Sequence, residues 1–128
     1  MNSTTLNRLL ACTALIGVSA LSSQAFAQTV VVNGADVNIA ADPAATPAIS
    51  FLTDHVASVD DAVNINTGVI TSVTNQGTLT LEGTSTVNGD VGDATKSLKL
   101  INAGIDAKTV TFGGNVFATS LQATGDGD

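Results

Sequence analysis

The stretch Asn75-Gln-Gly-Thr-Leu-Thr-Leu-Glu-Gly-Thr-Ser-Thr-Val-Asn-Gly-Asp-Val-Gly92 decides the fold of this chain. Within it, Leu79 and Leu81 alternate with polar residues, so an extended backbone would bury one row of side chains and expose the other. Glycines recur at short intervals and permit corners with positive φ. The pattern therefore predicts short strands separated by turns, and it contains no active-site motif.

A related order of residues returns further along the chain. Phe112-Gly-Gly-Asn-Val116 matches Val87-Asn-Gly-Asp-Val91 at an offset of 25 residues, and Asn102-Ala-Gly104 matches Asn75-Gln-Gly77 at an offset of 27. Such a period predicts a solenoid of stacked parallel coils. Asn88-Gly89, however, lies between apolar neighbours and is a strong signal for a two-residue antiparallel hairpin. A small antiparallel β-sandwich is therefore the alternative.

Turn signals divide residues 63–128 into segments of strand length, and we assign this region to β-solenoid coils. The expected strands are Val69 to Val73, Thr78 to Glu82, Leu98 to Ile101, Thr109 to Phe112 and Val116 to Leu121.

Residues 28–62 have a different pattern, and we expect them to form an N-terminal strand and helix cap region. Residues 28–41 alternate around Asn33-Gly34, which predicts a strand pair or a first coil. Thr46-Pro47 resembles a helix N-cap followed by an N1 proline. Apolar residues then recur at helical spacing, at Ile49, Leu52, Val56 and Val59. We therefore expect a short amphipathic helix that covers an open end of the solenoid, with a loop as the alternative.

Residues 1–27 have the features of a cleaved signal peptide. Arg8 precedes the apolar run Leu9 to Leu21, and Ala25-Phe26-Ala27 fits the rule for cleavage before Gln28. The run is short for a membrane helix, which needs roughly 20 residues, so an uncleaved anchor is the less favoured reading. We expect an exported protein at the bacterial cell surface, in the outer membrane or outside the cell, with the periplasm crossed in transit.

The composition after residue 27 excludes several classes of partner. Three lysines face 11 acidic residues, so the expected mature chain has a net charge of 3 − 11 = −8. Binding to phosphates needs clustered Lys and Arg, so we expect no nucleic-acid partner and no attraction to anionic lipids. We expect no membrane insertion by the mature segment. The mature chain also has no cysteine and cannot use disulfides.

Four phrases, in order, carry a family resemblance: Gly-Thr-Leu-Thr-Leu at 77–81, Ser-Thr-Val-Asn-Gly-Asp-Val-Gly at 85–92, Lys-Ser-Leu-Lys-Leu-Ile-Asn-Ala-Gly at 96–104 and Val-Thr-Phe-Gly-Gly-Asn-Val-Phe-Ala-Thr at 110–119. The segment from about Asn66 to Gly125 resembles the passenger region of autotransporter surface antigens of the rickettsial outer-membrane protein A and B type. The resemblance implies a right-handed parallel β-helix that acts as an adhesin or a coat-like surface layer. Members of that family are much longer and end in a translocator domain. We therefore expect the N-terminal piece of a longer protein, or a truncated relative.

Catalytic and metal-binding readings find little support. His55 is the single histidine, and no motif surrounds any serine, so we interpret it as a solvated residue. Glu82, Asp90 and Asp93 could supply a pair of glycosidase carboxylates, but Asp is common in turns for local reasons. Asp126-Gly-Asp128 and Asp60-Asp61 are too few for a calcium cage of 6 to 8 oxygen ligands. We expect no enzyme, no cofactor, no metal and no catalytic residue.

The function that the sequence favours is a noncatalytic structural or adhesin-like segment of an autotransporter-type surface antigen, which contacts a host-cell or neighbouring surface protein. A self-contained secreted β-rich binding domain is the alternative, and a fragment of a carbohydrate-active enzyme is a more distant one. Because each coil buries its apolar row against its neighbours, we also expect self-association through an open solenoid end near Phe112, Val116 and Phe117.

Overall fold

A computed structural model describes residues 29–40, 48–105 and 107–125 as a stack of short parallel strands. The described residues contain ten strands and no helix: β1 (Val30–Val32), β2 (Val37–Ile39), β3 (Ile49–Phe51), β4 (Val56–Val59), β5 (Val69–Thr71), β6 (Thr78–Leu81), β7 (Ser85–Val87), β8 (Leu98–Ala103), β9 (Val110–Phe112) and β10 (Ala118–Ala123). No segment of the described ranges forms a helix with the length and apolarity that a membrane span requires.

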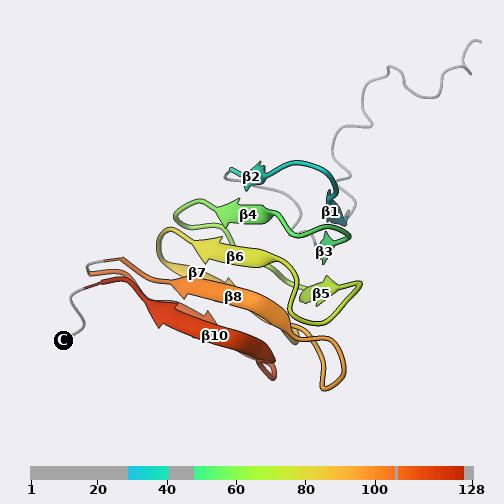
Figure 1. Ribbon diagram of the computed structural model, residues 1–128. Helices are drawn as coiled ribbons and strands as arrows, with labels where there is room; N and C mark the ends of the chain where they lie inside the picture. Colours follow the sequence, from blue (N-terminus) through green and yellow to red (C-terminus); the bar gives the residue numbers. More distant parts are fainter. Residues whose placement is uncertain (1–28, 41–47, 106, 126–128) are drawn as a thin grey trace, which may run out of the picture.

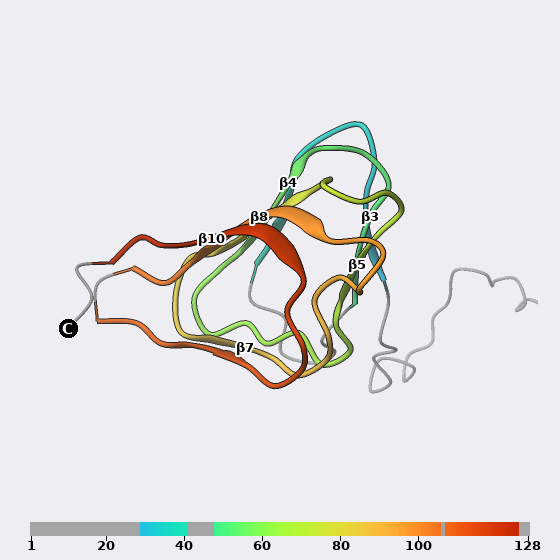
Figure 2. The ribbon, with the colours of Figure 1, turned by 60° about the horizontal axis from the view of Figure 1, so that its bottom comes forward.

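The strands form three sheets, and every pairing between strands is parallel. The five-stranded sheet has the order β10-β8-β6-β4-β2, the three-stranded sheet β1-β3-β5 and the two-stranded sheet β7-β9. The chain visits the sheets in turn and advances by one strand per circuit, so it winds as a right-handed parallel β-helix of about four turns (Figures 1 and 2). This confirms the solenoid and excludes the antiparallel sandwich.

The register shows where the expected repeat was correct. Val87 pairs with Phe112 and Val91 bridges Val116, so the offset of 25 residues is confirmed. The offset of 27 is wrong, because Asn102 pairs with Thr80, 22 residues earlier. Coil length changes along the stack: Thr78 pairs with Leu100 at an offset of 22, but Ser85 pairs with Val110 at an offset of 25. Three additional residues therefore lie in the corner between β8 and β9.

Asn88-Gly89 does not form the hairpin that its sequence favours. The flanking residues Val87 and Val91 both pair forward with the next coil rather than with each other. Gly89 lies against the backbone of the preceding coil, where an added Cβ would be 2.0 Å from the carbonyl oxygen of Thr67. The glycine is required here by the close approach of two coils, and not by a two-residue turn.

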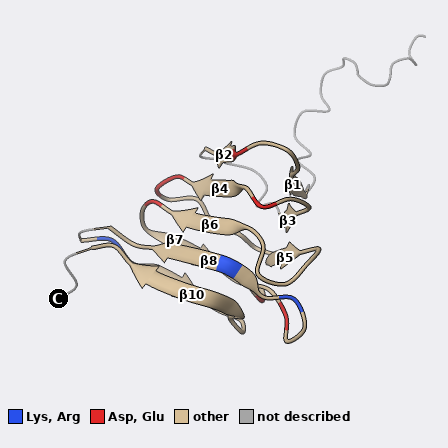
Figure 3. Cartoon of the chain, viewed as in Figure 1, with Lys and Arg blue, Asp and Glu red and all other residues tan. Residues whose placement is uncertain are grey.

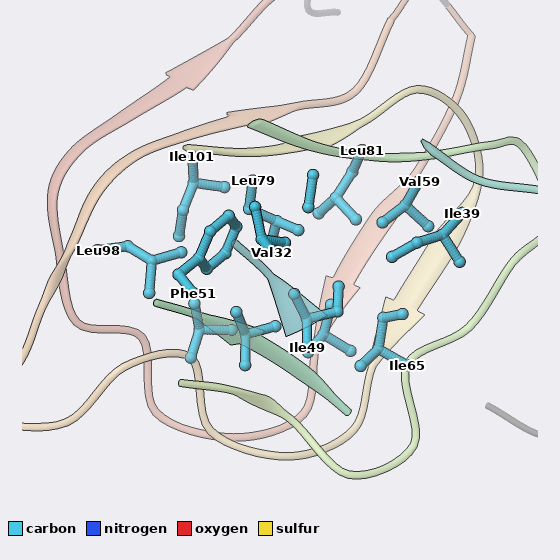
Figure 4. Close-up of a cluster of buried hydrophobic side chains, with 14 of the residues drawn as sticks. Val32, Ile39, Ile49, Phe51, Val59, Ile65, Leu79, Leu81, Leu98 and Ile101 are labelled. Atoms are coloured by element: carbon cyan, nitrogen blue, oxygen red, sulfur yellow. The ribbon is translucent and has the colours of Figure 1, made fainter. Parts of the chain in front are cut away.

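The core is a column of aliphatic side chains inside the coils, together with one aromatic ring (Figure 4). Inward positions alternate with outward ones along each short strand, as in Thr78–Leu81, where Leu79 and Leu81 are buried. Fully enclosed side chains come from successive coils: Val32, Ile49, Phe51, Val59, Ile65, Val69, Leu79, Leu81, Val87, Val91, Leu98 and Ile101.

The helix expected within residues 42–62 is wrong over its described part. Ile49–Phe51 is β3 and Val56–Val59 is β4, separated by a corner. The helix-like spacing of Ile49, Leu52, Val56 and Val59 has another cause. These apolar residues belong to two short strands and the corner between them, and this arrangement also places them three to four positions apart. Leu52, expected on the apolar face, is 46% exposed at that corner. The Thr46-Pro47 signal lies outside the described residues.

The N-terminal region therefore contributes coils instead of a helical cap. β1 and β2 belong to different sheets and pair in parallel with β3 and β4, so residues 28–41 contain a first coil and not a hairpin. All five strands expected after residue 63 are present, with ends that differ by one to two residues. β7 was not anticipated, because Ser85-Thr-Val87 has a single large apolar residue. The expected signal peptide at 1–27 lies outside the described residues.

Candidate functional site

Carboxylates at the corners of the solenoid bind the backbone of the following coil. Asp36 Oδ1 accepts the N–H of Val56 at 2.9 Å, and Asp61 Oδ1 accepts the N–H of Thr84 at 2.7 Å. Asp90 Oδ1 accepts the N–H of Asn115 at 2.8 Å. Corner amides have no strand partner, and a carboxylate is a strong acceptor for them. These aspartates therefore fix the register of one coil on the next.

Two lysines extend this connection across a whole coil. Lys99 Nζ lies 2.8 Å from Asp54 Oδ2, and Lys108 Nζ lies 2.7 Å from Asp61 Oδ2. Asp54 Oδ1 also accepts the N–H of Gly77, which belongs to the coil between Asp54 and Lys99. Each of these two aspartates therefore accepts a backbone N–H from the next coil, and it also pairs with a lysine from the second coil along.

The contacts of Asp36, Asp54 and Asp61 lower the pKa of these three carboxyls. The Lys99 ammonium is the largest influence on Asp54, and the Lys108 ammonium is the largest on Asp61, each lowering the pKa. The backbone N–H of Val56 lowers the pKa of Asp36 most, with His55 second. Asp93 has a lowered pKa because the Thr95 hydroxyl and backbone N–H donate to it. The lowered pKa values of these four carboxyls therefore follow from structural contacts between and within the coils.

His55 lies at the corner between β3 and β4 and not on a helix. Its Nδ1 is 3.2 Å from Asp36 Oδ1, and 36% of its side chain is exposed. Asp36 is simultaneously engaged with the N–H of Val56. The His55–Asp36 pair therefore forms part of the contact between the first two coils. Within the described residues, the His55 ring contacts the carboxylate of Asp36 and not the hydroxyl of a serine or threonine.

The carboxylates considered for glycoside hydrolysis have separate positions. Glu82 follows β6, and β7 separates it from Asp90. Asp90 is engaged with Asn115, and Asp93 closes its own turn by accepting from the N–H groups of Thr95 and Lys96. Of the residues weighed for calcium, Asp61 pairs with Lys108, and Asp126 and Asp128 lie outside the described residues. Within the described ranges, no cluster of three or more His, Cys, Asp or Glu side chains is arranged to hold a metal ion.

The most continuous surface in the described ranges is the outer face of the five-stranded sheet, which we call the neutral face. It is built from the outward positions of β2, β4, β6, β8 and β10, which the register aligns in two rows across the strands. One row consists of Val56, Thr78, Leu100 and Ser120, and the other of Asn38, Ser58, Thr80, Asn102 and Gln122. No ionisable side chain belongs to either row.

Most of the charged residues lie around this face, and Lys99 lies on β8 next to Leu100, where its ammonium pairs with Asp54. Figure 3 colours acidic residues at corners of the coils, Lys99 on β8 and the other two lysines in the corners before and after β8. At about 4.8 Å between strands, five strands give the neutral face a width of roughly 20 Å. A flat area of aliphatic and hydrogen-bonding groups on an acidic molecule is suited to contact with a macromolecule and not to enclosing a small ligand. Sequence reasoning missed this face because it depends on register across strands.

Comparisons with known proteins give no relative from which a function can be transferred. No protein-family model, no curated protein and no solved structure matches this chain.

Proposed function

We propose that this chain is a noncatalytic module, exported and displayed at the bacterial surface, that binds another protein through the neutral face. The observation that carries the proposal is the absence of charge from two rows of outward residues, one across four strands and one across five, on a chain with a net charge of −7. Lys99, which lies on β8 beside these rows, is paired with Asp54. The resemblance to rickettsial autotransporter passengers and the signal-peptide pattern of residues 1–27 support surface display.

The chemistry of the neutral face favours a protein partner. Val56 and Leu100 are half-buried and supply aliphatic contact, and the hydroxyls of Thr78 and Thr80 supply donors and acceptors beside them. Interface centres are depleted in charge, which is the composition of this face. Trp and Tyr, whose rings stack on sugars, are absent from the sequence, so a glycan is a weaker fit.

Binding is tested with two threonine variants on different sheets. Thr80 lies on the neutral face, and Thr111 faces outward from β9 in the two-stranded sheet. We expect the purified chain to bind saturably to the surface of a host-cell monolayer or to an envelope protein of the producing bacterium. We expect Thr80→Lys to lower the affinity at least about tenfold, roughly 1.4 kcal/mol, and Thr111→Lys to leave it unchanged. Circular dichroism of both variants checks the fold.

Absence of saturable binding, or equal losses in both variants, contradicts the proposed role of the neutral face. Surface display is tested separately, because it depends on the N-terminus. Fractionation of the producing bacterium should place the chain outside the inner membrane, and mass spectrometry should show Gln28 as the first residue. Retention in the cytoplasm with residue 1 intact contradicts export.

A further inference from the structure

The two ends of the coil stack differ in how well they bury their apolar side chains. In the first coil, Val32 and Ile39 have exposed fractions of 0% and 7%. In the last coil, Val116 and Leu121 are 37% and 58% exposed. Leu121 continues the inward column of Ile101, its register partner, which is fully buried. Within the described residues, the last coil therefore leaves part of its inward apolar row exposed.

The edge of β10 is also open to pairing. β10 contains six residues and pairs with β8 on one side, and it is the last strand of the five-stranded sheet. β2, the strand at the opposite edge, has three residues and directly follows Asp36. Natural edge strands are protected by charge, proline or bulges, and residues 118–123 contain neither a charge nor a proline. β10 thus lacks the features that prevent pairing with another chain.

The distribution of charge favours contact between two C-terminal ends. From residue 109 to residue 125 the sequence has no Asp, Glu, Lys or Arg, although the chain has a net charge of −7. The three lysines, Lys96, Lys99 and Lys108, lie in the coil immediately before. Asp126 and Asp128 follow this uncharged stretch in the sequence. Two copies that meet at their earlier coils would bring carboxylates together, whereas two copies that meet along residues 109–125 bring together a stretch without charge.

We propose that the C-terminal end binds a second copy of this chain, with β10 pairing antiparallel to β10 in a two-fold symmetric dimer. The same surface serves both copies, so the assembly closes after two. A head-to-tail filament would need exposed inward apolar side chains at the first coil, where Val32 and Ile39 are already buried. Val31 is 48% exposed, but it alternates with the buried Val32 along β1 and so faces outward from the three-stranded sheet. The proposal is independent of binding by the neutral face.

The alternation of side chains limits the register of this pairing. Residues directly opposite each other in an antiparallel pair point to the same face, so Leu121 can oppose Leu121 of the second copy on the core side. In that register, Ser120 opposes Gln122 on the outer side. The contact in each copy consists of one strand edge and one coil face. We expect it to bury less area than a standard interface of about 1,600 Å². The dimer should therefore be weak, and its population should depend on protein concentration.

The test compares Leu121 with Ile70, because the two side chains have the same exposed fraction of 58% and Ile70 lies on the outer face of the three-stranded sheet. Sedimentation equilibrium of the purified chain, with its processing state fixed by intact mass, should show a monomer–dimer equilibrium. Leu121→Lys should weaken it at least about tenfold, and Ile70→Lys should not change it. A monomer at the highest concentration, equal behaviour of the two variants, or species larger than a dimer overturns the proposal.

Disulfide cross-linking tests the register. In a Cys12→Ser background, Leu121→Cys should form a disulfide-linked dimer on mild oxidation, because opposed residues place their Cβ atoms about 4.5–5.5 Å apart. Ile70→Cys, equally exposed, should stay monomeric. Equal cross-linking of both cysteines would show random collision and overturn the symmetric pairing.

Discussion

Lys99 Nζ lies 2.8 Å from Asp54 Oδ2, although the two residues are 45 positions apart and belong to coils that are not neighbours. The intervening coil contributes the backbone N–H of Gly77, which donates to the other oxygen of Asp54. One carboxylate therefore ties three coils together at a corner that has no strand pairing. The paired Asp61 and Lys108 repeat this arrangement at another corner.

We expect Asp54→Ala to destabilise the fold more than Lys99→Met. The lysine variant removes one exposed ion pair, and such pairs contribute little. The aspartate variant also leaves the N–H of Gly77 without its acceptor. Urea denaturation followed by circular dichroism measures both midpoints. Equal shifts would show that the bond to Gly77 contributes nothing.

Stability should fall in acid. The pKa values of Asp36, Asp54, Asp61 and Asp93 are lowered from 3.8 in the folded protein. A lowered folded-state pKa gives stability that is complete above the unfolded value of 3.8 and is lost as pH falls through the lower folded values. Urea midpoints should therefore be nearly constant from about pH 5 to 7 and fall below about pH 4.

The control for this pH dependence is the triple variant Asp36→Asn, Asp54→Asn, Asp61→Asn. It should be less stable at pH 7 and should show a shallower loss in acid. Protonation also relieves repulsion among the acidic residues, which acts in the opposite direction. A wild-type midpoint that rises between pH 5 and pH 3 would mean that this relief outweighs the corner contacts.

Gly77→Ala should be much more costly than Gly34→Ala. The two glycines have similar φ values of +87° and +80°, so backbone strain is alike. A Cβ on Gly77 would lie 2.5 Å from the ring of Phe51, whereas a Cβ on Gly34 meets nothing within 4 Å. Strain costs about 1–2 kcal/mol at both sites, and overpacking adds about 1–3 kcal/mol at Gly77. Chemical denaturation of both variants should resolve this difference; similar losses would argue against the Phe51 contact.

Leu79→Ala and Leu121→Ala should differ although both residues lie in one inward column. Leu79 is fully buried and pairs with Ile101, which in turn pairs with Leu121. We expect a loss of about 2–5 kcal/mol for Leu79→Ala and under about 1 kcal/mol for Leu121→Ala. Thermal and urea unfolding at low protein concentration avoid any contribution from dimers. A large loss at Leu121 under those conditions would show that the last coil is covered.

The solenoid and the strands after residue 63 could be predicted because alternation in Thr78 to Glu82 and the offset between Val87 and Phe112 are local and strong signals. β3 and β4 could not, since strands this short contain only two inward residues each, and the corner between them produces helical spacing. The repeat starting at Asn102 was misaligned because Asn-x-Gly occurs at two different places in the coil: Asn75-Gln-Gly77 precedes β6, whereas Asn102-Ala-Gly104 ends β8.

The candidate surfaces were less accessible to sequence reasoning than the fold. The interpretation of His55 and the acidic residues as noncatalytic stays a prediction, and their contacts between coils, with residues 19 to 47 positions away, could not be found from motifs. The neutral face is also a property of the register, since Thr80 and Asn102 become neighbours only when coils stack. The contrast between the buried Val32 and Ile39 of the first coil and the exposed Leu121 of the last described coil also required the structure.

Parallel stacking of the coils is tested most directly by nuclear Overhauser contacts between backbone protons around Asn88-Gly89. The parallel register predicts contacts between the residues around Val87 and Phe112, and between those around Val91 and Val116, each 25 positions apart. A two-residue hairpin would instead bring Val87 opposite Asp90 and give antiparallel contacts across the dipeptide. Observation of the long-range parallel contacts is the predicted result, and antiparallel contacts between Val87 and Asp90 would contradict the solenoid.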